Sequence, residues 1–560
     1  MDNFQIADQF SLYAKLLDIH GENSFKSKSY GAAAFAIEKL QVPLSDLPFE
    51  KMAAIKGIGT SVVQKIVEVL ETEKLSVLDE LIEKTPPGII EMLSIKGIGP
   101  KKINTIWKEM EIESIGELLY ACKENRLKLY KGFGEKTQQN VIDSIQFYFS
   151  NKGFYLYAQA LPVASEILML LKQLLPEYQV EISGAIKRQL ETIAHFDFVT
   201  NAPLNTLVSI FSSNEFLKIS GQSQDCLLIS TPYQVEIRLF AFPDNYIMNA
   251  IRLSSSPEFW DALSPHIPTM NNSTEEPTFF SQYNLQYIPS YLREDAVMVK
   301  RALSHTLPNV LETKDIKGII HCHTQWSDGA HSVEEMAIAA RNLGLEYIVI
   351  SDHSRSAFYA QGLSIERVLA QQEHIDELNE RLFPFKIFKS IECDILNDGS
   401  LDYPDEILRR FDLVIASVHS NLKMNEEKAM LRLMNAIENP YTTILGHLTG
   451  RLLLSRPGYP VDHKKIIDAC AKNNVVIELN AHPSRLDIDW REINYALENN
   501  VLISINPDSH QTEGFSDIEY GVLMAQKAGV EKHQNLSSFN LNQFQDFLLK
   551  NRSQKVKSNI

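Results

Sequence analysis

The second half of the chain alternates short apolar runs with longer amphipathic segments. The apolar runs are rich in β-branched residues, as at 347–350 and 413–418. The segments between such runs, for example 333–343 and 365–381, repeat their apolar residues at helical spacing. Strands that are apolar throughout and are separated by helices are typical of a parallel sheet buried on both faces. We therefore expect residues 315–540 to form a parallel α/β barrel.

The first half contains an internal repeat instead. Ile-Lys-Gly-Ile-Gly occurs at 55–59 and again at 95–99, and a weaker copy lies at 130–136. Glycine lets the backbone approach a ligand closely, and the helix predicted after each copy offers free N–H groups to an anion. The repeat therefore favours contacts with phosphates, although an ordinary turn between two helices is the alternative. The glycines in question are Gly57, Gly59, Gly97, Gly99, Gly132 and Gly134.

Polar side chains with metal-binding chemistry follow the apolar runs of the second half. The nine residues of this set are His321, His323, Asp328, His353, Glu392, His419, His447, Asp508 and His510. In a parallel barrel the carboxyl ends of the strands meet on one face, so distant ligands can gather in one pocket. Imidazole together with carboxylate suits zinc, manganese or iron better than magnesium or calcium.

A structural role is the alternative for any one of these histidines. A single histidine at a strand end is commonly a hydrogen-bonded residue with no metal. Nine polar groups at one end of a sheet are harder to explain, because each unpaired buried group costs about 1 to 3 kcal/mol. Coordination of metal ions accounts for the whole set and predicts an enzyme.

The motifs around these residues resemble those of the PHP (polymerase and histidinol phosphatase) domain. They are His-Cys-His-Thr at 321–324, Ser-Asp-Gly at 327–329, Ser-Asp-His-Ser at 351–354, Gly-His-Leu-Thr-Gly-Arg at 446–451 and Pro-Asp-Ser-His at 507–510. The resemblance implies a distorted (β/α)7 barrel that holds three divalent metals, which are Zn, Mn or Fe.

The same resemblance distributes the ligands among three ions. One ion is assigned to His321, His323, Glu392 and Asp508. A second ion is assigned to Glu392, His419 and His447. The third ion is assigned to Asp328, His353 and His510. Neighbouring divalent metals activate water and hold a phosphate between them, so the expected reaction is phosphoester hydrolysis. Arg451 and Arg485 could clamp phosphate oxygens with their planar guanidinium groups, or could equally be ion-pair arginines.

The segment between the two halves resembles the palm of a family X DNA polymerase. Residues 182–197 match the pattern of Gly-Ser, two basic residues and Asp-x-Asp, while 235–240 is similar to the strand with a third carboxylate. Residues 287–294 resemble the end of the polymerase core. Together with the repeats, which resemble helix-hairpin-helix elements, and the PHP-like half, this order is similar to that of bacterial family X polymerases.

The resemblance fails at the expected catalytic carboxylates of the palm. His195 stands at the first carboxylate position, Glu236 at the third, and only Asp197 is retained. An imidazole is a poor ligand for Mg²⁺ and cannot bridge two ions as a carboxylate can. Binding of Mg or Mn at the palm is therefore doubtful, and we expect polymerase activity to be weak or lost. Slow synthesis with Mn²⁺ is the alternative.

The nucleotide pocket implied by this resemblance is only partly preserved. Gly184 and Arg188 match residues that would bind a triphosphate. Ala185 replaces the expected serine, and Ser254 lies where a Thr-Gly turn is expected. Lys65 falls where related polymerases carry a lysine that forms a Schiff base with a 5'-deoxyribose phosphate, although a phosphate-contacting or solvated lysine is the simpler interpretation.

Composition sets limits on these readings. A chain of 560 residues with 44% hydrophobic residues can build several domains with apolar cores. The five scattered cysteines and the absence of an apolar leader or membrane span predict a cytoplasmic protein. The net charge of −17 argues against a large nonspecific DNA-coating surface, but local hairpin contacts do not require one.

The sequence thus predicts a modular DNA-repair enzyme that acts on gapped, nicked or 3'-ended DNA. We expect it to be monomeric, although the sequence leaves the oligomeric state open. The main expected activity is metal-dependent 3'-5' exonuclease or 3'-end processing. An active gap-filling polymerase, a histidinol-phosphatase-like enzyme for small phosphates and a non-catalytic DNA scaffold remain as alternatives. The expected regions are helical domains at 1–85 and 86–150, a palm at 151–240, a thumb-like region and linker at 241–310, the PHP domain at 315–540 and a frayed basic tail at 541–560.

Overall fold

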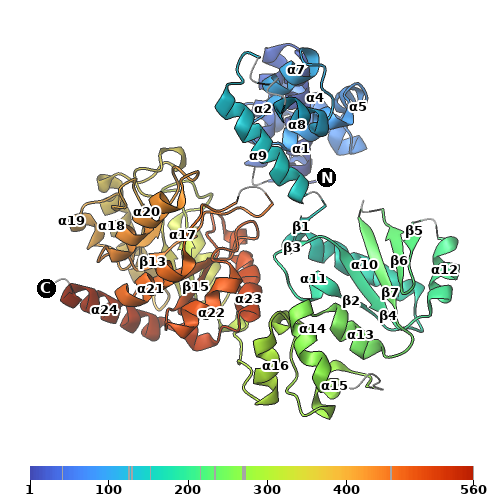
Figure 1. Cartoon of the computed structure of the whole chain (residues 1–560). Coiled ribbons are helices and arrows are strands. Elements are labelled where there is room, and N and C mark those ends of the chain that lie inside the picture. Colours follow the sequence, from blue (N-terminus) through green and yellow to red (C-terminus); the bar gives the residue numbers. More distant parts are fainter. Residues whose placement is uncertain are drawn as a thin grey trace. The chain divides into compact units, whose positions relative to one another are not determined.

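The chain folds into two compact units in a computed structural model, Met1–Lys152 and Gly153–Ile560 (Figure 1). The structure describes residues 1–40, 42–123, 127, 130–151, 153–214, 216–232, 235–267, 273–454 and 457–558. In this part of the chain, none of the helices combines the length and apolar character that a membrane span requires.

The first unit is helical. Its first helix begins at a capping box, in which the Asp2 side chain accepts from the Gln5 amide, and it ends at the left-handed residue Gly21. Phe10, Ile66 and Ile103 belong to the single apolar cluster that holds the helices together. The helices are α1 (Asn3–His20), α2 (Ser24–Glu38), α3 (Phe49–Ala53), α4 (Thr60–Thr72), α5 (Ser76–Glu83), α6 (Pro87–Glu91), α7 (Pro100–Lys108), α8 (Ile115–Lys123) and α9 (Glu135–Asn151).

The second unit begins with a mixed sheet, which we call the palm-like sheet. Its strand order is β2-β4-β7-β6-β5, and β4 pairs with β7 in parallel while the other neighbours are antiparallel. The strands are β2 (Val180–Ile182), β4 (Phe196–Thr200), β5 (Lys218–Gln222), β6 (Cys226–Ser230) and β7 (Glu236–Ala241). Helices α10 (Tyr157–Leu174) and α12 (Leu204–Ser212) contribute Ile167 and Leu207 to its core. The short strands β1 (Tyr155–Leu156) and β3 (Thr192–Ile193) pair beside it.

A group of helices follows with an apolar cluster of its own. Phe259, Phe279 and Phe280 are fully buried in this cluster. The helices are α13 (Tyr246–Leu253), α14 (Pro257–Leu263), α15 (Glu276–Gln282) and α16 (Ala296–Leu303).

The remainder of the second unit is parallel α/β, as the alternating pattern predicts. One sheet has the order β10-β9-β8 and the other has the order β11-β12-β13-β14-β15. All neighbours in both sheets are parallel. The strands are β8 (Gly318–Cys322), β9 (Tyr347–Ile350), β10 (Lys386–Lys389), β11 (Glu392–Asp394), β12 (Ile415–Ser417), β13 (Ile444–Leu445), β14 (Val476–Asn480) and β15 (Ile503–Asn506).

The two parallel sheets approach each other at their edges. Isolated bridges pair Cys322 with Ser509 and His353 with Glu392, both in parallel orientation. Closure into a seven-stranded barrel remains a prediction, because these bridges are single residue pairs. The helices between the strands are α17 (Val333–Asn342), α18 (Ile365–Leu382), α19 (Asp405–Leu408), α20 (Glu426–Glu438), α21 (His463–Asn473), α22 (Trp490–Glu498) and α23 (Ile518–Lys527).

The prediction of a frayed tail at 541–560 is wrong for most of that segment. Leu541–Ser558 forms helix α24. Phe544 is fully buried, and its ring stacks on Tyr347 of β9 with 4.5 Å between ring centroids. Helix α24 therefore packs against the amino ends of the parallel strands, where Tyr347 begins β9. Residues 559–560 and the side chains of Lys555 and Lys557 lie outside the described residues.

Candidate functional site

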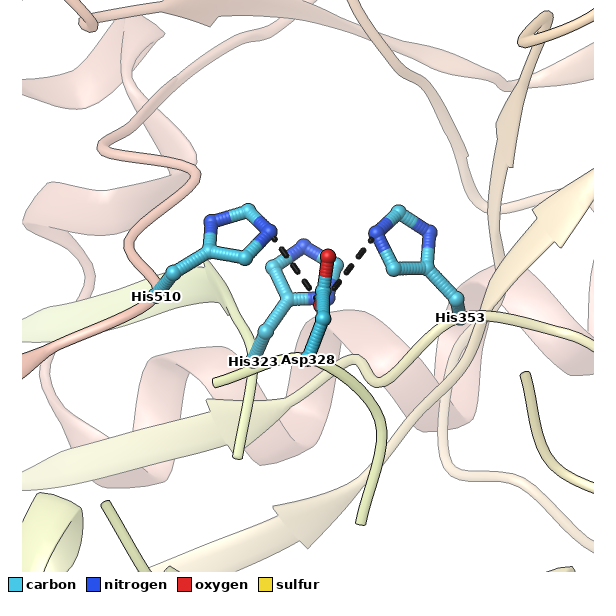
Figure 2. A group of neighbouring side chains, drawn as sticks. All are labelled: His323, Asp328, His353 and His510. Carbon is cyan, nitrogen blue, oxygen red and sulfur yellow. Dashed lines mark ion pairs between the residues drawn. The ribbon is translucent and has the colours of Figure 1, made fainter. Parts of the chain in front are cut away.

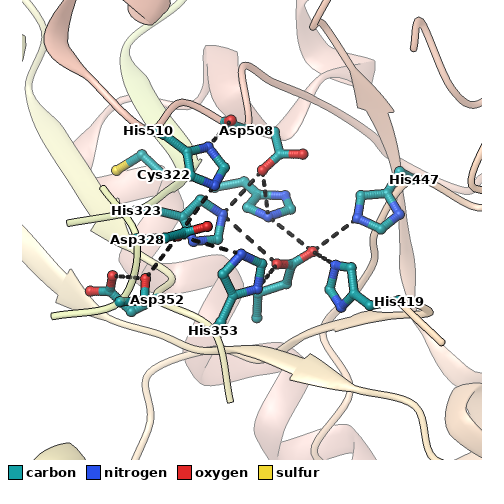
Figure 3. A network of polar contacts seen from close by, with 12 residues as sticks. Cys322, His323, Asp328, Asp352, His353, His419, His447, Asp508 and His510 are labelled. Atoms are coloured by element: carbon teal, nitrogen blue, oxygen red, sulfur yellow. Dashed lines mark hydrogen bonds and ion pairs between the residues drawn. The ribbon is translucent and has the colours of Figure 1, made fainter. Parts of the chain in front are cut away.

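The nine predicted metal ligands lie at the carboxyl ends of the parallel strands. His321 lies within β8, His353 follows β9, and Glu392 begins β11. His419 and His447 each lie two residues beyond the ends of β12 and β13, and Asp508 and His510 follow β15. Figure 3 shows these side chains around one centre. Because the strands are parallel, their carboxyl ends bring together residues separated by up to 189 positions, from His321 to His510.

Two of these residues adopt a backbone conformation that costs energy. His321 has φ 71° and Asp508 has φ 52°, both in the left-handed region. Such a conformation costs a non-glycine residue about 1 to 3 kcal/mol and persists where the surrounding structure requires it. The strain is therefore located at the centre of the ligand set.

One group of ligands is formed by His323, Asp328, His353 and His510 (Figure 2). One ligand atom from each lies within 4.8 Å of those of the others. Asp328 Oδ1 lies 3.4 Å from His510 Nε2 and 3.6 Å from His353 Nε2. The His323 ring stacks between the other two imidazoles, with centroids 4.2 Å from His510 and 4.3 Å from His353. The resemblance assigns Asp328, His353 and His510 to one ion, and the structure adds His323 to that neighbourhood.

Two further groups share buried carboxylates. In one of them Asp508 Oδ1 lies 3.4 Å from His321 Nε2 and 3.1 Å from His323 Nε2. The other contains His353, Glu392 and His419, with Glu392 Oε1 at 3.1 Å from His419 Nε2. His447 Nε2 also lies 3.0 Å from Glu392 Oε1. Glu392 is therefore the carboxylate with the most imidazole neighbours in the set.

The donor atoms fit divalent metal ions. His321 Nε2 is buried and has no hydrogen-bond partner in the described part of the chain, and the buried Glu392 Oε2 lies 2.9 Å from His353 Nδ1. A buried polar atom without such a partner is costly, and a coordinated cation would satisfy both atoms. The mixture of imidazole and carboxylate is one that zinc, manganese and iron accept.

Buried charges at this centre stabilise one another. Burial disfavours the charged form of His419, but Glu392 and Asp394 outweigh that effect and raise its pKa to about 10. Burial is likewise outweighed at Glu392, where His419 and His321 hold the pKa well below its usual range. Glu392 is therefore ionised at neutral pH, as a metal ligand must be, whereas His419 would have to lose its proton when a metal ion binds.

Two buried carboxylates that sequence reasoning missed orient the imidazoles. His321 Nδ1 donates to Glu478 Oε2 at 2.6 Å, and His419 Nδ1 donates to Asp394 Oδ1 at 2.5 Å. Each bond turns the Nε2 atom of its histidine toward the centre, as such carboxylates do in metal sites. A charged residue inside an apolar strand was the available signal, since Glu478 lies between Ile477 and Leu479 of β14.

Asp352 fixes the loop that carries Asp328. Its fully buried carboxylate accepts from the Thr324 amide at 2.8 Å, from the Ser327 hydroxyl at 2.5 Å and from Gln371 Nε2 at 2.6 Å. The motif Ser-Asp-His-Ser contains this residue, so the sequence indicated its region but not its role.

The two predicted phosphate clamps differ in their surroundings. Arg451 donates to the carbonyls of Arg485 and Leu486, and its Nη1 lies 2.5 Å from Asp489 Oδ2. Its guanidinium is thus committed to the fold, as in the ion-pair alternative. Arg485 Nε lies 3.7 Å from Asp508 Oδ2, so it is beside the nine predicted ligands, which we call the metal-ligand cluster. The Arg485 side chain is 21% exposed. Of the two arginines, Arg485 therefore has the surroundings that the predicted phosphate contact requires.

In the palm-like sheet, the retained carboxylate Asp197 is paired with an arginine. Asp197 of β4 pairs in register with Arg238 of β7, not with Glu236. Arg238 Nε and Nη2 donate to Asp197 Oδ1 and Oδ2 at 2.6 and 2.8 Å. Glu236 is exposed and accepts from the Ser220 hydroxyl at 2.7 Å, and its assignment to the palm site stays a prediction. His195 is exposed on the segment before β4.

The predicted nucleotide-binding residues also have partners within the protein. Gly184 has φ +59°, and a Cβ at this position would lie 2.2 Å from Asp197 Oδ2, so glycine is required there. Arg188 Nη1 lies 2.8 Å from Glu294 Oε2. A triphosphate would have to displace this carboxylate to reach the guanidinium.

The glycine repeats of the first unit have the expected local form. Gly57, Gly97 and Gly132 have φ of 100°, 88° and 93°. Gly59 and Gly99 are the N-caps of α4 and α7, and neither supplies a side-chain cap, so helix N–H groups face outward for an anion. Gly134 directly precedes α9. Lys65 Nζ lies 2.5 Å from Glu68 Oε2, and its lyase role stays a prediction.

These features define a class of protein: helix-hairpin-helix units precede a mixed sheet and a parallel α/β domain with a candidate metal centre. Family models agree with this order. Residues 1–75 match a helix-hairpin-helix domain, 89–146 match a SAM-like helix-hairpin-helix tandem, and 320–482 match the PHP domain.

Similar proteins extend the match over the whole chain. The chain is 31% identical to the DNA polymerase/3'-5' exonuclease PolX of Bacillus subtilis (strain 168), over 98% of this chain and 99% of that protein. A probable phosphatase of Acetivibrio thermocellus is 34% identical over 29% of this chain and 64% of its own length. A probable phosphatase of Vibrio parahaemolyticus is 29% identical over 41% and 92%, respectively. The chain belongs to the PolX family of family X DNA polymerase/3'-5' exonucleases.

Proposed function

We propose that this protein is a metal-dependent 3'-5' exonuclease that trims DNA ends held by its hairpin domains. The observation that carries the proposal is the clustering of imidazoles around the buried carboxylates Glu392 and Asp508. The family match supports the same activity, because its full-length relative is named as a 3'-5' exonuclease.

The metal-ligand cluster would hold up to three divalent ions. Bound ions of this kind lower the pKa of a coordinated water and offset charge on the leaving oxygen. The residues of the chain have separate tasks. Glu478 and Asp394 orient the histidines, Asp352 fixes the loop of Asp328, and Arg485 donates hydrogen bonds to a phosphate oxygen.

DNA is the substrate that the remainder of the chain favours. Outward-facing helix N-termini after Gly59 and Gly99 can bind backbone phosphates without reading bases. A small-molecule phosphatase has no use for such elements. The predicted gapped, nicked or 3'-ended DNA is therefore the proposed substrate, and a small phosphate such as histidinol phosphate is the alternative that the test must separate.

The test uses purified full-length protein and a 5'-labelled oligonucleotide, single-stranded or in a gapped duplex. With added Mn²⁺ or Zn²⁺ we expect a ladder of products shortened stepwise from the 3' end. A chelator should abolish the ladder. Hydrolysis of histidinol phosphate is measured in parallel. An intact oligonucleotide in the presence of metal, with rapid release of inorganic phosphate from histidinol phosphate, contradicts the proposal.

We also propose that polymerase activity is weak or lost. The ion pair between Arg238 and Asp197 carries this second proposal. Two-metal nucleotidyl transfer needs carboxylates that are free to coordinate, and here a guanidinium occupies both oxygens of the one that is retained. Primer extension on gapped DNA with Mg²⁺ and Mn²⁺ tests it, and efficient synthesis with either ion contradicts it.

A further inference from the structure

The palm-like region, residues 153–241, contacts the α/β domain through the carboxylate of Glu191, which has two partners. Glu191, just before β3, is 8% exposed. Its Oε2 accepts from Trp490 Nε1 at 3.1 Å, and its Oε1 accepts from Arg491 Nη1 at 2.6 Å. Trp490 and Arg491 form the first turn of α22, so Glu191 fixes the position where this helix begins.

A chain of charged contacts leads from α22 to the metal-ligand cluster. Arg491 Nη1 lies 2.9 Å from Asp489 Oδ1, and Asp489 Oδ2 lies 2.5 Å from Arg451 Nη1. Arg451 Nε in turn donates to the carbonyl of Arg485 at 2.9 Å. The chain of contacts thus ends on the backbone of the arginine beside the cluster.

The segment that receives these contacts is residues 482–489, which we call the Arg485 loop. It leaves β14 and returns to it, because the Asn480 amide donates to the Asp487 carbonyl at 2.7 Å and the Ile488 amide donates to the Glu478 carbonyl at 3.1 Å. Leu486 has a left-handed backbone with φ 45°, so the loop needs support from its neighbours.

Apolar contacts from the palm-like region reach the same loop. Tyr157 and Ala158, at the start of α10, line one small cavity together with Pro483 and Leu486. The Tyr157 amide also donates to the Glu191 carbonyl at 3.1 Å, which ties α10 to the carboxylate described above. The palm-like region therefore lies beside the loop at this cavity, and Glu191 reaches the loop indirectly, through Arg491 of α22.

We infer that Glu191 is a positioning residue for hydrolysis, which holds Arg485 at the metal-ligand cluster through Arg491, Asp489 and Arg451. The inference rests on the proposed exonuclease function. Under this inference the palm-like region supports the Arg485 loop of the neighbouring domain. This role does not depend on metal ions bound in the palm. Arg485 contacts the substrate, and Glu191 acts through it.

The first test measures the loop without any reaction. Amide hydrogen exchange is followed by mass spectrometry in wild type, Glu191→Ala and Glu191→Gln. We expect Glu191→Ala to speed exchange in a peptide covering 482–489 by roughly fivefold or more, while a peptide covering β12 stays unchanged. Glu191→Gln can still accept from Trp490 and should give a smaller effect. Equal exchange in wild type and Glu191→Ala overturns the inference.

The control for simple loss of domain contact is Glu294→Gln. Glu294, just before α16, forms an ion pair with Lys527 of α23, and it has no contact with the Arg485 loop in the described residues. We expect this variant to leave exchange in 482–489 at the wild-type rate. If Glu294→Gln speeds exchange in 482–489 as much as Glu191→Ala does, the loop is held by the overall contact between the two regions and not by the contacts of Glu191. That result also overturns the inference.

The second test is a double-mutant cycle on oligonucleotide hydrolysis. Glu191→Ala should lower kcat/KM by about tenfold, as coupled residues do, with metal content unchanged. In an Arg485→Ala background the same change should have no further effect. Additive losses overturn the inference even where wild type is active. An inactive wild type defeats the proposed function instead, and the exchange experiment then still decides whether Glu191 holds the loop.

Discussion

Arg238 neutralises Asp197 across two adjacent parallel strands of the palm-like sheet. The two residues are register partners, and the guanidinium donates to both carboxylate oxygens at 2.6 and 2.8 Å. Asp197 is largely buried, so a cation would have to replace a positive charge that is already in place. The proposed loss of polymerase activity rests on this relationship more than on the presence of His195.

Adding carboxylates beside Asp197 while removing its arginine partner should raise nucleotide incorporation. The double variant His195→Asp with Arg238→Asp adds two carboxylates beside Asp197 and removes the ion pair that occupies Asp197 in wild type. We expect primer extension on gapped DNA with Mn²⁺ to rise by about tenfold or more, because nucleotidyl transfer depends on two ions held by such groups.

The matched control is His195→Asp with Glu236→Asp, which changes the exposed residue two positions away from Arg238. This variant should not exceed wild type, because Arg238 still occupies Asp197. Equal activity in the two double variants contradicts the role assigned to the Arg238 ion pair. No gain in either variant means that the pocket around Ala185 and Ser254 is also unsuited to nucleotides.

This comparison shows where prediction from sequence stops. Glu236 and Arg238 are two residues apart, so they lie on the same face of β7, and an alternating pattern cannot say which of them faces Asp197. The strand register decides this, and it depends on pairing between segments distant in sequence. By contrast, the metal-ligand cluster could be predicted, because its members lie at the ends of apolar parallel strands or in the segments just beyond them.

The partners of those ligands were harder to predict. Glu478 of β14 orients His321, and Asp394 of β11 orients His419. A charged residue inside an apolar strand interrupts the pattern but does not indicate which side chain it contacts. Arg451 carried two equal interpretations, because sequence cannot say whether a guanidinium finds a carbonyl or a phosphate. The hydrogen bonds of Arg451 to the Arg485 loop form only when β14 and α22 pack together, so they could not be predicted from the sequence.

Glu392 should be the most sensitive residue of the metal-ligand cluster. It is 1% exposed and lies within 3.1 Å of both His419 and His447. Glu392→Gln removes the charge that offsets bound cations, so we expect bound metal to fall and exonuclease activity to drop more than about 100-fold. Elemental analysis of the purified protein and the 3'-end assay measure the two effects. Glu334→Gln on α17, which removes an exposed ion pair with Arg381, is the control and should resemble wild type.

Asp394→Asn should weaken metal binding without removing a ligand. The amide still accepts from His419 Nδ1 but no longer carries the charge that favours this orientation. Changes of this kind commonly cost about 10- to 100-fold in metal affinity. Competition with a fluorescent zinc chelator measures the affinity directly. An unchanged affinity would show that Asp394 does not tune His419.

Arg485→Ala and Arg451→Ala should separate substrate binding from folding. Loss of the Arg485 guanidinium should lower kcat/KM by about 10- to 100-fold and leave thermal stability and metal content near wild type. Loss of Arg451 leaves Asp489 with one partner fewer and the Arg485 loop without its carbonyl contacts, so stability should fall by about 3 kcal/mol. Thermal melts and kinetics on both variants test this. An Arg451→Ala protein as stable as wild type contradicts the role given to its ion pair.

Lys527 should make stability depend on pH between about 8 and 10.5. Its side chain has no exposure, it ion-pairs with Glu294, and its Nζ donates to the Arg188 carbonyl at 2.9 Å. Burial lowers the pKa of this lysine from 10.5 to about 8, against the opposing effect of Glu294. Below pH 8 both the folded and the unfolded chain hold the proton, and the cost of burying the charge is fully present. Between the two pKa values the unfolded chain binds more protons, so the free energy of unfolding rises with pH, by about 3 kcal/mol over the window.

The comparison with Lys527→Met isolates this effect, because methionine has similar length and no titrating group, and Glu294 keeps its ion pair with Arg188. Urea unfolding followed by tryptophan fluorescence at pH 7, 8, 9 and 10 suits the site, since Lys527 Nζ lies 4.7 Å from the centroid of the Trp490 ring. Wild type should gain stability relative to the variant as pH rises, whatever the trend common to both proteins. Parallel curves for the two proteins would mean that Lys527 keeps its proton throughout, held by Glu294 despite its burial.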